Sequence, residues 1–173
     1  MDAVVFGDVV HQRAALRVED APFILQLVNE PSWLRFIGDR GVKSLQDANR
    51  YILTGPVAMY ERLGFGLYLV VLKDGMAPLG LCGLLKRDTL PEPDLGFALL
   101  PQYWRLGYAH EAAAAVLSDA WHRLQLSRIL AITSQDNVAS ERLLGKLGFR
   151  YERMLQLDAD KETLKLFAVS TPR

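Results

Sequence analysis

The chain has very little cysteine or histidine and no excess of charge of either sign. Its 173 residues include one cysteine and three histidines, and 20 basic residues balance 20 acidic ones. A single cysteine forms no internal disulfide, and because Cys82 stands among leucines we expect a buried, unreactive thiol. No spacing typical of a metal site is present in the sequence. The even balance of charge argues against broad electrostatic binding of nucleic acid or of an anionic membrane.

Long apolar runs are also lacking, although 50% of the residues are hydrophobic. The uninterrupted runs fall well short of the roughly 20 residues that a membrane-spanning helix needs. Residues 1–10 are apolar, but they carry Asp2 and Asp8 and no lysine or arginine, so they do not read as a secretory signal. We therefore expect one soluble, cytoplasmic domain over residues 1–173, large enough to bury a sound core.

The most informative stretch covers residues 95–120. An apolar run ends at Pro101, a short loop holds Arg105 and Gly107, and from Ala109 apolar residues recur at helical spacing. Such a strand, loop and helix direct the free N–H groups of the first helical turn to one point, where the helix dipole favours an anion. Gly107 lets a phosphate approach the backbone, and Arg105 offers a guanidinium. The pattern alone is weak, because many α/β domains have such turns without a ligand.

Residues 101–112 resemble the acetyl-CoA pyrophosphate loop of the GCN5-related N-acetyltransferase (GNAT) superfamily, reading Pro-Gln-Tyr-Trp-Arg-Leu-Gly-Tyr-Ala-His-Glu-Ala. Within the superfamily they are most similar to the branch that acetylates the N-terminal residues of ribosomal proteins. The resemblance implies cofactor contacts from the loop residues Arg105, Leu106, Gly107, Tyr108 and Ala109. Trp104 is a departure, since the general pattern has Gln or Arg there. His110 stands where relatives commonly have Thr or Ser, and we expect it on the surface.

A second informative stretch covers residues 134–149. Asn137 suits a helix N-cap, the leucines that follow form a buried face, and Gly148 can end the helix in the left-handed conformation. Capping alone accounts for Asn137. The stretch also resembles the superfamily's Asn-x-x-Ser and Lys-Leu-Gly-Phe signature, which implies that Asn137 and Ser140, at the start of this helix, contact the cofactor.

The β-type run 128–133 is expected to lie parallel to the strand that precedes the central helix, because a right-handed crossover joins them. If the two strands splay apart, an extended thioester arm can insert its amides between them like another strand. The resemblance implies that the pantetheine arm bonds to the backbone near Ala98, Leu99 and Leu100. The splaying itself cannot be read from sequence.

Shorter signals, together with the resemblance, predict a mixed α/β (α+β) domain. The resemblance implies a mostly antiparallel, twisted sheet of six to seven strands, with one splayed parallel pair and about four helices. An Asp-Gly turn at 73–75 indicates a hairpin, and Gly55-Pro56 predicts an irregular middle in a long helical stretch. We expect one helix to begin at 19–22, a helical region to begin at 31–37, and a further helical stretch over 44–63. Strands are expected at 13–18, 67–72, 79–85, 94–100, 150–157 and 162–169.

Acetyl transfer requires a group that accepts a proton from the amine and one that protonates the departing thiolate. Asp94 stands where relatives of the superfamily often carry a Glu base, one methylene longer, although a loop-edge acid is an equally good interpretation. Leu144 replaces the Tyr that many members use as acid. In the N-terminal-acetylating branch a Ser early in the same helix substitutes for it, and this maps onto Ser140, although such a Ser often only bonds a carbonyl one turn back.

The resulting hypothesis is an acetyl-CoA-dependent N-acetyltransferase that moves the acetyl group to a primary amine by direct transfer in a ternary complex. The favoured acceptor is the N-terminal amine of a protein or peptide. Two alternatives stay open: transfer to a small-molecule amine such as an antibiotic, polyamine or amino acid, and a CoA-binding sensor without turnover. Arg142 and Lys146 are one turn apart and can meet the ribose phosphate, but more often form a solvated face. The acceptor, and whether the chain forms a homodimer, are left undetermined.

Overall fold

The computed structural model describes residues 10–13, 15–158 and 162–172. They form one seven-stranded sheet with strand order β1-β2-β3-β4-β5-β7-β6. Only β4 and β5 are parallel, and every other neighbouring pair is antiparallel. The strands are β1 (Val10–Arg13), β2 (Leu67–Leu72), β3 (Pro78–Leu85), β4 (Asp94–Leu99), β5 (Arg128–Ser134), β6 (Arg150–Gln156) and β7 (Thr163–Ser170). The expected mixed sheet with one parallel pair is therefore confirmed.

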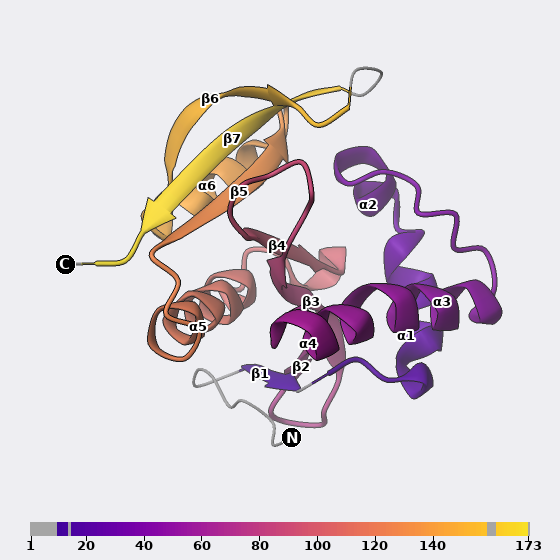
Figure 1. Ribbon diagram of the computed structural model, residues 1–173. Helices are drawn as coiled ribbons and strands as arrows, with labels where there is room; N and C mark the ends of the chain where they lie inside the picture. Colours follow the sequence, from indigo (N-terminus) through magenta and orange to yellow (C-terminus); the bar gives the residue numbers. More distant parts are fainter. Residues whose placement is uncertain (1–9, 14, 159–161, 173) are drawn as a thin grey trace.

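Helices cover both faces of the sheet (Figure 1). In that view α1, α2 and α3 lie to the right of the central strands, α5 lies to the left, and α6 lies behind β5 and β7. The described residues form six α-helices: α1 (Ala21–Val28), α2 (Pro31–Phe36), α3 (Leu45–Ile52), α4 (Ala58–Leu63), α5 (Tyr108–His122) and α6 (Val138–Lys146). Short helical turns are η1 (Val18–Asp20), η2 (Leu53–Val57) and η3 (Pro101–Tyr103).

Alternate side chains of the strands pack on opposite faces and create two main clusters. The first, which we call the α5 cluster, joins alanines and leucines of α5 to Cys82, Leu95, Leu99, Ile129 and Leu144. The second, the α1 cluster, joins α1, α3 and Trp33 of α2 to Leu67, Leu69, Val71 and Leu81. Trp33 is thus a packing residue, and α1, α2 and α3 pack on the face opposite α5.

The N-terminal strand was expected at 13–18, and that prediction is wrong. The strand β1 ends at Arg13, and the chain then turns, with Ala15 at a φ of +29°. The backbone N–H of Arg17 donates to the Asp20 carboxylate at 2.9 Å, and the Asp20 N–H donates to the Arg17 carbonyl at 2.9 Å. These local bonds hold a turn where the alternation of the sequence suggested a strand.

The helical stretch 44–63 is interrupted as predicted. Ser44 accepts a hydrogen bond from the Asp47 N–H and caps α3, and the π-type turn η2 contains Pro56. A proline removes one backbone donor and disturbs the preceding turn, which explains the break. Gly64, at a φ of +73°, ends α4 in the left-handed conformation.

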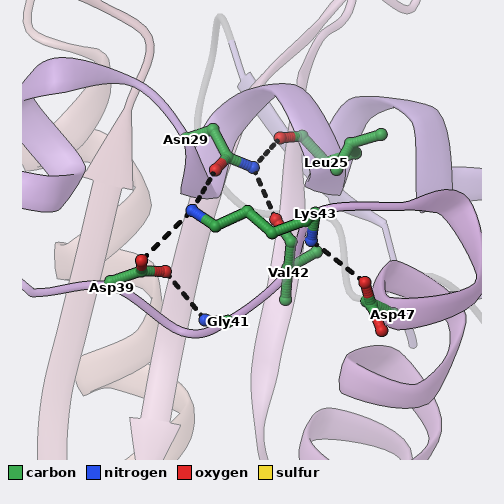
Figure 2. Close-up of polar contacts among 7 residues, drawn as sticks. All are labelled: Leu25, Asn29, Asp39, Gly41, Val42, Lys43 and Asp47. Atoms are coloured by element: carbon green, nitrogen blue, oxygen red, sulfur yellow. Dashed lines mark hydrogen bonds and ion pairs between the residues drawn. The ribbon is translucent and has the colours of Figure 1, made fainter.

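The connection between α2 and α3 has no regular structure, but it is tied to α1 by side chains (Figure 2). Asn29 donates to the carbonyls of Leu25 and Val42, both at 2.8 Å, and accepts from Lys43 Nζ at 3.2 Å. Lys43 also lies 3.1 Å from the Asp39 carboxylate. One amide side chain therefore fixes this loop onto α1, which gives the segment a defined shape without a strand or helix.

The C-terminal hairpin forms as expected, with β6 paired to β7 and β7 paired to β5. Of the turn that joins them, residues 159–161 lie outside the described part of the chain. Within the described residues, no helix is long and apolar enough to cross a membrane.

Candidate active site

The parallel strands β4 and β5 pair at one position and then separate. Asp94 is opposite Leu130, and the Leu130 N–H donates to the carbonyl of Pro93 at 2.9 Å. No further pair between these two strands is formed in the described part of the chain, although β4 continues to Leu99. The C-terminal half of β4 therefore has an open backbone edge on the side of β5.

The register with β3 shows which residues face this open edge. The Leu100 N–H donates to the Leu79 carbonyl at 2.8 Å, so this residue, and Ala98 before it, direct their backbone groups to β3. Phe97 and Leu99 alternate with them and direct theirs toward β5. The resemblance placed the cofactor contacts near Ala98, Leu99 and Leu100. In this register the backbone of Ala98 and Leu100 is directed to β3, while Phe97, which the resemblance did not name, faces the gap together with Leu99. The sequence could not reveal this, because it does not give the register.

Trp104 has a position that the sequence did not predict. Its indole Nε1 donates to the Leu99 carbonyl at 2.8 Å, while 46% of the residue remains exposed. The Leu99 carbonyl, on the open edge of β4, is therefore already hydrogen-bonded by a side chain of the loop that follows the strand. The groups that an inserted ligand can still reach here are the N–H and C=O of Phe97 and the N–H of Leu99.

The loop after β4 and the start of α5 form a concave set of backbone amides. Arg105 has a φ of +63° and Gly107 a φ of +88°, and left-handed residues in such a turn aim successive N–H groups inward. The Glu111 N–H donates to the Gly107 carbonyl at 3.0 Å, so α5 begins here. The N-cap residue is Gly107, which has no side chain to cap this end of the helix. The first-turn amides of Tyr108 and Ala109 therefore remain available to an anion.

The start of α6 lies beside the end of β5. The Asn137 side chain accepts from the Ser140 N–H at 3.1 Å, so capping accounts for its oxygen, and its amide nitrogen is not used in that bond. Ser140 is half-buried and lies one helical turn before Leu144, which is fully buried in the α5 cluster. Because residues four apart share a helix face, Ser140 is turned toward the sheet.

Asp94 lies where β4 and β5 are still paired, at the closed end of the gap. It is 1% exposed, and Arg87 Nε contacts both carboxylate oxygens at 3.0 and 3.1 Å. Burial raises the pKa of Asp94 above its ordinary value, and the Arg87 guanidinium opposes part of that rise. The sequence did not reveal Arg87 as its partner. A raised pKa suits a proton acceptor, whereas the ion pair also makes Asp94 an anchor for the loop between β3 and β4.

The other residues singled out from the sequence lie outside this arrangement. Cys82 is fully buried, and burial raises the pKa of its thiol to about 12, so it is unreactive as expected. His110 and His122 are exposed, and the described residues contain no group of three side chains that could hold a metal ion. Arg142 and Lys146 are both exposed on α6, which fits a solvated face.

The separated strands and the open helix end lie next to each other, because the same loop joins β4 to α5. Together they offer an anion site and, beside it, a strip of free backbone donors and acceptors. A ligand that fits both features has a phosphate group and an extended arm carrying amides, which is the chemistry of coenzyme A.

Comparison with known proteins points to the same chemistry. Residues 13–150 match the model of an acetyltransferase (GNAT) domain. A Bacillus subtilis (strain 168) protein named uncharacterized N-acetyltransferase YoaA is 31% identical over 140 residues, which cover 80% of this chain and 78% of the relative. An acetyltransferase structure from Agrobacterium tumefaciens covers 99% of this chain and is itself covered to 95%, with a TM-score of 0.82 and 21% identity.

A further similar structure is RimL, a ribosomal L7/L12 alpha-N-protein acetyltransferase in complex with coenzyme A. The similarity covers 98% of each chain, with a TM-score of 0.82 and 17% identity, and at that identity it shows the fold alone. The family match extends over most of the chain and includes the open strand edge and the exposed helix end. The chain belongs to the GNAT family of N-acetyltransferases.

Proposed function

We propose that this protein transfers the acetyl group of acetyl-CoA to the N-terminal amine of a protein or peptide, by direct transfer in a ternary complex. The observation that carries the proposal is the separation of β4 from β5 beyond their single paired position, next to the start of α5, whose N-cap is a glycine. Acetyl-CoA supplies the acetyl group activated as a thioester. Direct transfer is supported by the burial of Cys82, the only cysteine, which leaves no accessible thiol to carry the acetyl group.

In this proposal the cofactor follows the loop from α5 to β4. The backbone of residues 105–109 holds the pyrophosphate, with the guanidinium of Arg105 as an added charge. Phe97 and Leu99 bond the amides of the arm as a neighbouring strand would. The side chain of Asn137 and the start of α6 complete the far wall of the site.

An N-terminal amine is the acceptor that needs the least help from the site to lose its proton. Its pKa of about 8 lies more than two units below that of lysine, so the uncharged fraction at pH 7.5 is about 200-fold larger than for lysine. The similar RimL structure is that of an alpha-N-protein acetyltransferase, which supports this choice. On the face opposite α5, Arg35 of α2 pairs with Asp136 at 2.7 Å, and this contact joins α2 to the loop before α6.

Asp94 and Ser140 are the proposed proton acceptor and proton donor. The raised pKa of Asp94 makes it a stronger base than a surface carboxylate, and a water relay to the amine is compatible with its burial. Ser140 is turned toward the sheet from the first turn of α6, where its hydroxyl can donate to the departing thiolate.

The test measures thiol release from acetyl-CoA with three matched acceptors. The first is a peptide with a free N-terminus and no lysine, the second is the same sequence with a blocked N-terminus and one lysine, and the third is a set of polyamines, aminoglycosides and amino acids. We expect turnover with the first peptide and an acetyl group on its N-terminal amine by mass spectrometry. Turnover with small amines alone would favour a small-molecule enzyme. Tight acetyl-CoA binding by calorimetry, without turnover on any amine, would indicate a sensor.

A further inference from the structure

The hydroxyl of Thr133 is a buried polar group that finds no hydrogen-bond partner in the described part of the chain. The residue is 7% exposed and lies one position before the end of β5. An unsatisfied buried hydroxyl is costly, and such groups in folded proteins usually have a partner, which a ligand can supply. The position of Thr133 identifies that ligand.

Thr133 lies three residues beyond Leu130, the last position of β5 that pairs with β4. Three residues beyond Asp94 on β4 is Phe97, whose backbone faces the gap. Thr133 and Phe97 therefore lie on opposite sides of the separated strands, at the same level. The backbone of Thr133 pairs with Lys165 of β7, so the side chain is the group that Thr133 itself can offer to a ligand.

The side chain of Thr133 lies on the face that carries the α5 cluster. Ile129 and Ala131 belong to that cluster, and alternate residues of a strand share a face. Leu144 of α6 belongs to it as well, and Ser140 precedes Leu144 by one turn on the same helix face. Two hydroxyls, from β5 and from α6, thus lie at the same end of the cluster, beside the open gap.

We propose that the Thr133 hydroxyl is a binding group for the thioester end of the acyl-CoA arm, to which it donates a hydrogen bond. This inference rests on the proposed function, because it requires that the arm enters between β4 and β5. It adds a residue on the β5 side, opposite the backbone contacts of β4. It also accounts for the presence of a threonine in a buried strand, where a valine of the same shape would pack without an unpaired polar atom.

The test compares Thr133→Val with Thr171→Val, because Thr171 donates to the Leu126 carbonyl at 3.0 Å and follows the far end of β7. Thr133→Val is expected to weaken CoA binding by roughly 2- to 12-fold, the effect of one lost hydrogen bond. Its binding of adenosine 3′-phosphate 5′-diphosphate, which lacks the arm, should be unchanged. The unfolding temperature of the ligand-free variant should be equal to or about 2–4 °C above wild type, since an unpaired hydroxyl is removed. The control should bind both ligands like wild type.

The directions of the two changes, in CoA affinity and in unfolding temperature, distinguish this role from a structural one. If Thr133 had only a structural role, its replacement by valine would lower the unfolding temperature and leave the affinity for CoA unaltered. Equal CoA affinity in wild type and Thr133→Val would overturn the inference alone. Absence of CoA binding by folded wild type would overturn the proposed function, and this inference with it.

Where Thr133→Val fails to fold, Thr133→Cys provides the measurement. With CoA, reduced glutathione and oxidised glutathione as the oxidant, we expect a mixed disulfide with CoA in preference to glutathione, seen by mass spectrometry. Wild type should form none, because its only thiol is buried. An adduct no richer in CoA than that of Thr171→Cys would contradict the proposal.

Discussion

Replacing Gly107 with aspartate places a carboxylate at the mouth of α5, where we propose that the pyrophosphate binds. A β-carbon at this position meets nothing within 4 Å, so the fold accepts the side chain, but the φ of +88° strains any residue other than glycine. Asn and Asp tolerate that conformation best, at a cost of about 1 kcal/mol. Gly107→Asn is therefore the matched control, with the same shape and strain and no charge.

The difference between the two variants isolates electrostatics. A carboxylate about 5 Å from a phosphate charge is repelled by roughly 1–3 kcal/mol at this exposed site, which corresponds to about 5- to 150-fold weaker binding of acetyl-CoA for Asp than for Asn. A negative charge near a helix N-terminus stabilises the helix itself, so the ligand-free Asp variant should be no less stable than the Asn variant. Calorimetry measures the affinities and thermal unfolding measures the stabilities. Equal affinities of the two variants would refute the anion site.

Two further predictions concern the proposed acid and base. Ser140→Ala leaves the backbone bond to Asn137 intact, so turnover should fall about 100-fold or more while acetyl-CoA affinity is unchanged; full activity would remove Ser140 from the mechanism. Asp94→Asn should abolish turnover and cost about 1–3 kcal/mol of stability, because Arg87 loses its charged partner. Because the pKa of Asp94 is raised on folding, the stability of wild type relative to Asp94→Asn should decrease as pH rises above about 4. Urea unfolding of both proteins from pH 4 to 7 measures the direction of this change. A constant difference over that range, with the Glu92→Gln variant as reference, would show that the Asp94 pKa is not raised.

The elements whose signals are local were predicted well from the sequence. The hairpin of β2 and β3, the break at Pro56, the Asn137 cap and the left-handed Gly148 each follow from residues within a few positions of one another. The strand expected at 13–18 failed for the opposite reason. Its alternation is compatible with a strand, but the Asp20 carboxylate bonds the backbone of Arg17 and holds a turn.

The parts of the candidate site that sequence reasoning missed depend on contacts between distant segments. Whether Phe97 or Ala98 faces the gap is decided by the register of β3 against β4. The pairing of Asp94 with Arg87 depends on how the loop between those strands folds back, and the isolation of the Thr133 hydroxyl depends on what packs around β5. None of these relations has a sequence period or motif, which is why the family resemblance predicts the segments of the site but not the orientation of their groups.

Hydrogen exchange of single amides, followed by NMR with and without CoA, tests the insertion of the arm between β4 and β5 most directly. We expect the amides of Phe97 and Leu99 to exchange rapidly in the free protein and slowly with saturating CoA. The Leu100 amide, which already bonds the Leu79 carbonyl, should be slow in both states and serves as the internal control. Protection of Phe97 and Leu99 that is the same in both states would contradict the account.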